Sequence, residues 1–106
     1  MALLAVITTT ATEEEARAIA RALVDRGLAA CVQISALESF YIWQGAVQQE
    51  PEYRVVAKTT EERYPDVEQT IKELHSYELP AIYGLPLHPV YAPYAEWVRT
   101  SSGGSR

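Results

Sequence analysis

The apolar positions along the chain predict short, well-punctuated elements, beginning with a strand and a helix. An apolar and β-branched run over Leu3 to Thr9 is typical of a strand buried on both faces. Thr12 opens a Thr-x-x-Glu capping box, and apolar residues then recur at helical spacing up to Val24. Gly27 follows where a left-handed helix cap is expected. These signals predict an amphipathic helix directly after the first strand.

The longest feature is a hairpin that extends from Leu28 to Thr60. Its first arm, up to Trp43, is rich in apolar, β-branched and aromatic residues, and Gln44-Gly45 can supply a tight turn before alternation resumes. An arm of about sixteen extended residues would reach on the order of 50 Å. A compact chain of this length has a radius of gyration of only about 13 Å. We therefore expect the hairpin tip to project beyond its own core.

The remaining chain predicts a helix, a strand and a short terminal helix. Pro65 suits the first turn of the helix, which should end near His75 or Ser76. Breaks in the alternation of the hairpin also predict bends or bulges around Ser35 to Glu38 and at Pro51. The other expectations are an inward stripe of Tyr64, Val67, Ile71 and Leu74, a strand over Ala81 to Leu87, a helix over Tyr94 to Arg99 with Tyr94 and either Trp97 or Val98 facing inward, and a Gly/Ser tail from Ser101.

This order of elements predicts an α+β fold of the ferredoxin-like βαββαβ type, an antiparallel sheet with two helices on one face and a short C-terminal helix. We expect one domain over residues 1–100 and a flexible tail over residues 101–106. The second face of the sheet has no helix assigned to it. That face and the aromatic tip Phe40 to Trp43 both need cover, which predicts self-association.

Composition narrows the classes of partner. The chain has 106 residues, 48% of them hydrophobic, and a formal net charge of −5. The negative charge argues against nucleic acid or an anionic membrane as the partner. The single cysteine, Cys31, cannot form an internal disulfide, and neither a signal peptide nor a membrane helix is visible, so a cytoplasmic protein is expected.

The strongest candidate for metal chemistry is His75, which lies at a predicted helix end with Glu78 three residues later. Imidazole and carboxylate can share a divalent cation, although the same histidine can simply complement a helix dipole. Cys31 is a second candidate ligand, and its alternative role is that of a small buried hydrophobe.

A further set of residues mixes aromatic rings with opposite charges and is expected to form an interface between subunits or a pocket there. Its members are Gln33, Ser39, Tyr41, Trp43, Glu52, Lys58 and Tyr77.

Several motifs together resemble the CutA divalent-cation tolerance family. They are Leu28-Ala29-Ala30-Cys31-Val32, Ser39-Phe40-Tyr41-x-Trp43-x-Gly45, Glu52, Lys58-Thr59, His75-x-Tyr77-Glu78-x-Pro80 and Tyr94-x-x-Trp97. The resemblance implies a ferredoxin-like subunit, an interlocked homotrimer and a link to tolerance of copper and other divalent metals. It implies Cu(II), Zn(II) or another divalent cation as a weakly bound ligand that folding does not require. Where some relatives have a metal-binding cysteine and a histidine pair, this chain has Thr8 and Leu74-His75.

No enzyme signature accompanies these motifs, since no phosphate-binding loop, nucleophile elbow or zinc spacing is present. The expectation is therefore a non-enzymatic protein. Two alternatives are a ligand-sensing trimer that resembles PII-type proteins and a stable scaffold for another protein. The tight Gln44-Gly45 turn differs from the long loop that PII-type proteins carry at this place.

Overall fold

The structure is a computed structural model, and it describes residues 2–103. The elements are β1 (Leu3–Thr10), α1 (Glu13–Asp25), β2 (Cys31–Trp43), β3 (Ala46–Thr60), a 3₁₀ turn (Glu61–Arg63), α2 (Tyr64–Leu74), β4 (Ile82–Leu87) and α3 (Ala92–Ser101). The four strands form one sheet in the order β2-β3-β1-β4, and every neighbouring pair is antiparallel. This arrangement confirms the predicted ferredoxin-like fold.

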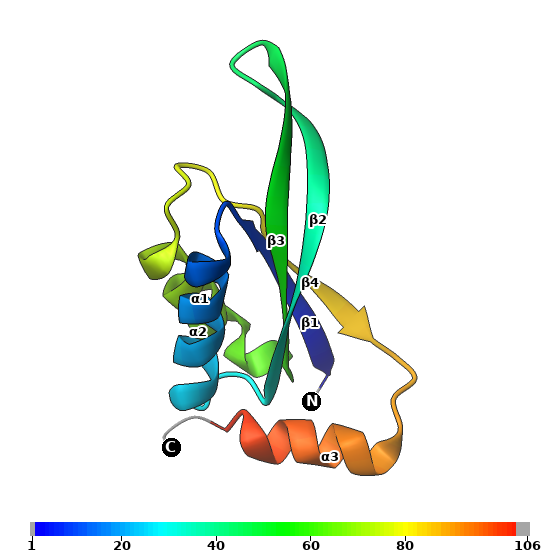
Figure 1. The fold of residues 1–106 in the computed structure, drawn as a ribbon. Helices are drawn as coiled ribbons and strands as arrows, with labels where there is room; N and C mark the ends of the chain where they lie inside the picture. Colours follow the sequence, from blue (N-terminus) through cyan, green and yellow to red (C-terminus); the bar gives the residue numbers. More distant parts are fainter. Residues whose placement is uncertain (1, 104–106) are drawn as a thin grey trace.

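Both α1 and α2 lie on one face of the sheet, as Figure 1 shows. The main core forms between these helices and the sheet and includes Val6, Ile19, Leu23, Val55 and Ile71. A smaller core lies where α3 crosses one end of the sheet, with Val98 packed beside Leu3 and Leu87. The central strand β1 is buried from both sides, as its unbroken apolar run predicted.

The first helix begins and ends as its sequence signals predict. The backbone amide of Glu15 donates to the Thr12 hydroxyl at 3.2 Å, which satisfies one free N–H of the first turn. Gly27 has a φ of 68°, the left-handed conformation that the missing side chain permits. The capping box is nevertheless only half formed, because the Glu15 carboxylate bonds to Ser76 instead.

The β2–β3 hairpin projects far beyond the helices (Figure 1), and the longest dimension of the subunit is 45 Å. The two strands pair without a break from Cys31 opposite Lys58 to Trp43 opposite Ala46. Of the bends or bulges expected near Ser35 to Glu38 and at Pro51, no bulge is present, and the two strands instead curve and twist smoothly along their length. Gln44 and Gly45 close the hairpin with φ values of 52° and 80°, typical of a type I′ turn.

Three expectations for the second half of the chain were wrong. Leu74 is 37% exposed because it occupies the last turn of α2, beyond the sheet. The terminal helix is longer than expected; Val98 faces the core as predicted, but Ala95 accompanies it there in place of Tyr94, which is 36% exposed. The tail was expected to begin at Ser101, yet Ser101 ends α3 and Ser102 is buried; residues 104–106 lie outside the described residues.

No helix among residues 2–103 is long and apolar enough to span a membrane.

Candidate functional site

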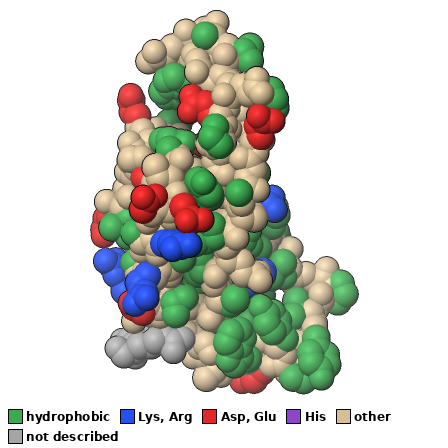
Figure 2. Space-filling view, viewed as in Figure 1, with side chains coloured by type: hydrophobic (Ala, Val, Ile, Leu, Met, Phe, Trp, Pro, Cys, Tyr) green, Lys and Arg blue, Asp and Glu red, His purple; other side chains and the backbone are tan. Residues whose placement is uncertain are grey.

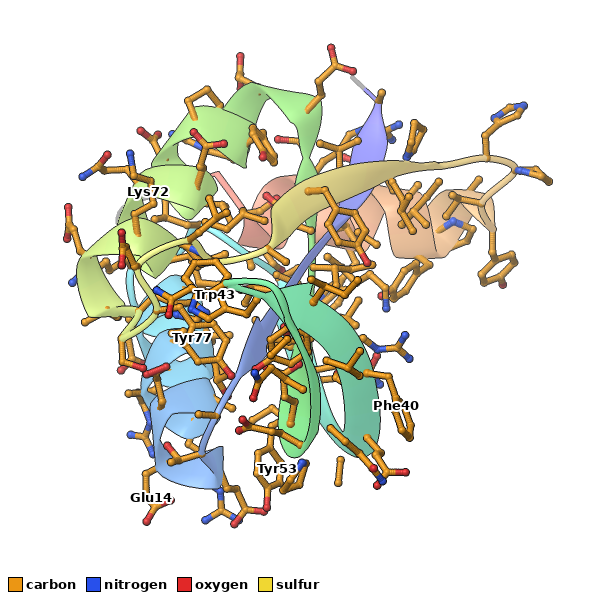
Figure 3. All side chains as sticks on the ribbon, turned by 90° about the horizontal axis from the view of Figure 1, so that it is seen from above. Glu14, Phe40, Trp43, Tyr53, Lys72 and Tyr77 are labelled. Carbon is orange, nitrogen blue, oxygen red and sulfur yellow. The ribbon has the colours of Figure 1, made fainter. Side chains whose placement is uncertain are left out.

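A cavity of about 420 Å³ lies between the projecting hairpin and the segment that links α2 to β4. Its lining combines aromatic rings with two carboxylates, and it consists of Thr9, Ser39, Phe40, Tyr41, Trp43, Glu52, Tyr77, Glu78, Leu79 and Ala81. Six of these residues belong to the sets predicted from the sequence. The fold thus brings residues from three separate motifs into one concave site, and Figure 3 shows Trp43 and Tyr77 close together there.

Strand alternation explains why the hairpin residues converge. Ser39, Tyr41 and Trp43 are alternate residues of β2 and therefore point to one side of the hairpin. Glu52 of β3 stands opposite Leu37 in the register, so its side chain emerges on that same side. The two-residue turn fixes this register, because a slip of one residue would move every one of these side chains to the other face.

Glu52 is the buried charged group of the site, with only 6% of its surface exposed. The Tyr77 hydroxyl donates to its Oε2 atom, which joins the linking segment to β3 across the cavity. Burial raises the pKa of Tyr77 above its ordinary value, and the hydrogen bond to Glu52 raises it further. Tyr77 is thus held in its neutral, donating form, and among residues 2–103 no lysine, arginine or histidine forms an ion pair with Glu52.

His75 positions the segment that carries Tyr77. Its side chain is completely buried, and Nε2 lies 2.8 Å from the Thr9 carbonyl oxygen, which can only accept a hydrogen bond. Nε2 therefore carries the hydrogen, and Nδ1 accepts a hydrogen bond from the Tyr77 backbone amide at 3.1 Å. The two rings are also in contact, with centroids 4.9 Å apart. His75 thus ties the end of α2 to β1 and sets the place of Tyr77.

Glu15 supports the same segment from α1. Its carboxylate accepts hydrogen bonds from the Ser76 amide and the Ser76 hydroxyl, both at 3.1 Å, and lies 3.7 Å from His75 Nδ1. The sequence suggested only a helix-capping role for this residue. Its contact with Ser76 spans 61 positions and depends on the packing of α1 beside α2, so no local pattern could indicate it.

The predicted metal ligands do not form a metal centre within the subunit. Both nitrogens of His75 are engaged in hydrogen bonds, so the imidazole has no free lone pair for a cation. Glu78 is exposed at the cavity, while Cys31 lies at the opposite end of β2, eight residues or roughly 26 Å from Ser39. Within the described part of the chain, no three His, Cys, Asp or Glu side chains come together to hold a metal ion.

Gln33 and Lys58 also lie apart from the cavity. Lys58 donates from Nζ to the Gln33 side-chain oxygen at 3.3 Å, beside the position where Cys31 pairs with Lys58 in the register. The set of interface or pocket residues predicted from the sequence therefore combines two separate regions of the structure, the cavity and the Gln33–Lys58 pair. It missed Thr9, Leu79 and Ala81 as lining residues, since nothing in their own side chains signals a site.

Comparison with known proteins places the chain in a family. The profile of the family described as CutA1 divalent ion tolerance protein matches residues 4–101. The divalent-cation tolerance protein CutA of Thermus thermophilus is 41% identical over 99 residues, 92% of this chain and 96% of that protein. Protein CutA of Homo sapiens is 35% identical over 88 residues, 82% of this chain and 49% of that protein.

Solved structures agree with this assignment. The divalent cation tolerance protein Cut A1 of Thermus thermophilus superimposes with a TM-score of 0.91 at 40% identity, over 95% of this chain and 99% of that one. The periplasmic divalent cation tolerance protein CutA of Archaeoglobus fulgidus gives 0.92 at 30% identity, over 96% and 99% of the two chains. Because the profile, the relatives and the fold agree over almost the whole length, the chain belongs to the CutA1 family of divalent ion tolerance proteins.

Proposed function

We propose that this protein acts as a homotrimer, without enzymatic activity, in the cellular response to divalent cations. The tolerance role comes from the names of its relatives, and the number of subunits from the resemblance to their family. The observation that carries the proposal of self-association is the projecting hairpin. Phe40 is 64% exposed near its tip, and Ile42 and Val47 are each 73% exposed. Apolar side chains gathered on such a projection are typical of a protein interface.

A second apolar surface lies at the other end of the subunit. Tyr83 and Leu85 of β4 and Trp97 of α3 are each about half exposed, and Figure 2 shows apolar side chains gathered in the region of α3. The two surfaces come from different elements, so a contact between them would be heterologous. Heterologous contacts close into a ring when the rotation between subunits closes, and a ring of three subunits is the assembly proposed here.

Light scattering at micromolar concentration tests the assembly. We expect a mass three times the 11.8 kDa of one subunit for the wild type. The double variant Phe40→Ser and Ile42→Ser should shift the protein toward monomer, because it removes apolar area from the tip. Lys72→Ser, an exposed substitution on α2, serves as the control and should leave the mass unchanged. A folded wild-type monomer would refute the proposal.

Direct binding of Cu(II) or Zn(II) is proposed to be weak and independent of His75. The hydrogen bonds to Thr9 and from Tyr77 occupy the imidazole, so a metal ion would have to displace one of them. Calorimetric titration of Cu(II) into the wild type and into His75→Gln should give equal heats, since glutamine can keep the donor to Thr9. Loss of the heat in a folded His75→Gln protein would restore His75 as a ligand.

The cellular location proposed here is the cytoplasm. Cys31 is a free thiol, as is usual in a reducing compartment, whereas the Archaeoglobus fulgidus relative is described as periplasmic. Cell fractionation distinguishes the two locations, and recovery in the periplasmic fraction would overturn this part of the proposal.

A further inference from the structure

The cavity next to the hairpin presents a buried carboxylate that has only one partner. Among the described residues, the only hydrogen bond to Glu52 comes from the Tyr77 hydroxyl and reaches Oε2. Removing an ionised carboxylate from water is costly unless a positive charge or several donors replace the water. The second oxygen, Oε1, is not among the fully buried atoms that lack a partner, so it remains accessible and favours a positive charge in this cavity.

The surrounding charges have the same sign. Glu78 lines the cavity beside Glu52, and Glu50 is close enough to help raise the pKa of both Tyr41 and Tyr77, after the larger effect of burial. No ion pair within residues 2–103 neutralises Glu50, Glu52 or Glu78. These carboxylates repel an anionic ligand and attract a cation.

The walls distinguish an organic cation from a metal ion. A divalent metal ion needs several oxygen, nitrogen or sulfur ligands around one point, and no such group of acidic, histidine or cysteine side chains exists in the described chain. Tyr41, Trp43 and Tyr77 instead offer aromatic rings, which attract weakly hydrated organic cations. The volume of about 420 Å³ also falls within the range of small-molecule sites.

We propose that this cavity binds a small organic cation, an ammonium or guanidinium group attached to an apolar body. The positive group would lie at Glu52, and the apolar body would pack against Tyr41 and Trp43. This role goes beyond the response to divalent cations, and the hairpin wall of the cavity belongs to the same projection that we propose for self-association. The same chemistry is present in a lysine or arginine side chain of a neighbouring subunit, and the experiment below separates that source from a free ligand.

Benzylammonium is a suitable probe because benzyl alcohol is its neutral counterpart of similar shape. Binding is followed by the fluorescence of Trp43 in a Trp97→Phe background, which removes the only other tryptophan. We expect benzylammonium to bind at least about tenfold more tightly than benzyl alcohol, and Glu52→Gln to weaken benzylammonium by about tenfold. Glu14→Gln makes the same charge change on an exposed site of α1, away from Trp43 and Tyr77 (Figure 3), and should have little effect.

Glu78→Gln provides a second variant, because an exposed glutamate can be replaced without disturbing the fold. We expect it to weaken benzylammonium by about threefold, in line with a partly screened charge. Equal binding of the alcohol and the ammonium, or unchanged affinity in both folded variants, would overturn the proposal. Failure of benzylammonium to bind the wild type would also overturn it, and is the outcome expected if a neighbouring subunit's side chain fills the cavity. Light scattering of the wild type, with Trp97 in place, reports separately on the proposed trimer.

Discussion

Replacing Thr8 with valine is expected to stabilise the protein. Thr8 is fully buried on the helix-facing side of β1, where Val55 and Ile82 stand opposite it in the neighbouring strands. No group among the described residues forms a hydrogen bond with its Oγ1 atom. A buried hydroxyl without a partner costs about 1–3 kcal/mol in proteins. Valine keeps the branched shape and replaces the hydroxyl by a methyl group that the apolar neighbours can pack against.

From these values we expect the free energy of unfolding to rise by about 1–2 kcal/mol, or the melting temperature by about 4–10 °C for a domain of this size. The matched control is Thr59→Val. Thr59 is equally buried, but its hydroxyl donates to the Leu28 carbonyl oxygen at 2.7 Å. Its replacement should lower the free energy of unfolding by about 1–2 kcal/mol, because it leaves that carbonyl unpaired.

Urea denaturation of the three proteins at one protein concentration measures the difference and keeps any effect of self-association constant. The prediction has a sign as well as a size, since Thr8→Val should stabilise and Thr59→Val should destabilise. If both variants lose stability to a similar degree, the Thr8 hydroxyl has a partner in solution and the reasoning is refuted.

Two further predictions concern the hairpin and its partner segment. Because its pKa is raised in the folded protein, Tyr77 keeps its proton when unfolded tyrosines ionise near pH 10, so its contribution to stability is complete below that pH and is lost as pH rises above it. Tyr77→Phe should therefore be less sensitive to alkaline pH than the wild type in denaturation curves from about pH 8 to 11, and parallel curves would contradict this. Gln44→Asn should raise the free energy of unfolding by about 0.5 kcal/mol, because asparagine tolerates the positive φ of the turn better. Gln48→Asn on the neighbouring strand is the control, and equal effects would refute an origin in the turn.

Local patterns in the sequence were sufficient where they reflect the conformation of a few neighbouring residues. The capping threonine of α1, Gly27 at its end and the Gln44-Gly45 turn all behave as predicted. The prediction of bulges was wrong because polar residues in β2 interrupt the alternation of the sequence without interrupting the pairing of the strands. The prediction that Tyr94 faces inward was wrong because α3 packs against the end of the sheet through the small Ala95 and through Val98.

The candidate site shows the same division between local and long-range information. The aromatic residues of the hairpin were recognised as a group because they lie near the predicted hairpin tip and occur together with charged residues. The role of His75 was not recognised from the sequence. Whether a histidine is free to bind a metal depends on which atoms lie beside its two nitrogens. Here those atoms belong to Thr9, on a different element, and to Tyr77, whose amide turns back toward the ring.

The sequence by itself determined the order of elements, the length of the hairpin and the aromatic and acidic residues that its alternation places together. Periodicity and turn chemistry act over a few residues, so they can be read along the chain. Only the tertiary structure decided that the segment after α2 lies against the hairpin, that Tyr77 meets Glu52 across 25 positions, and that His75 supports this contact instead of presenting a free ligand. Such contacts depend on the packing of both helices against the sheet. The Glu52 carboxylate becomes buried without a neighbouring cation only once the chain has folded.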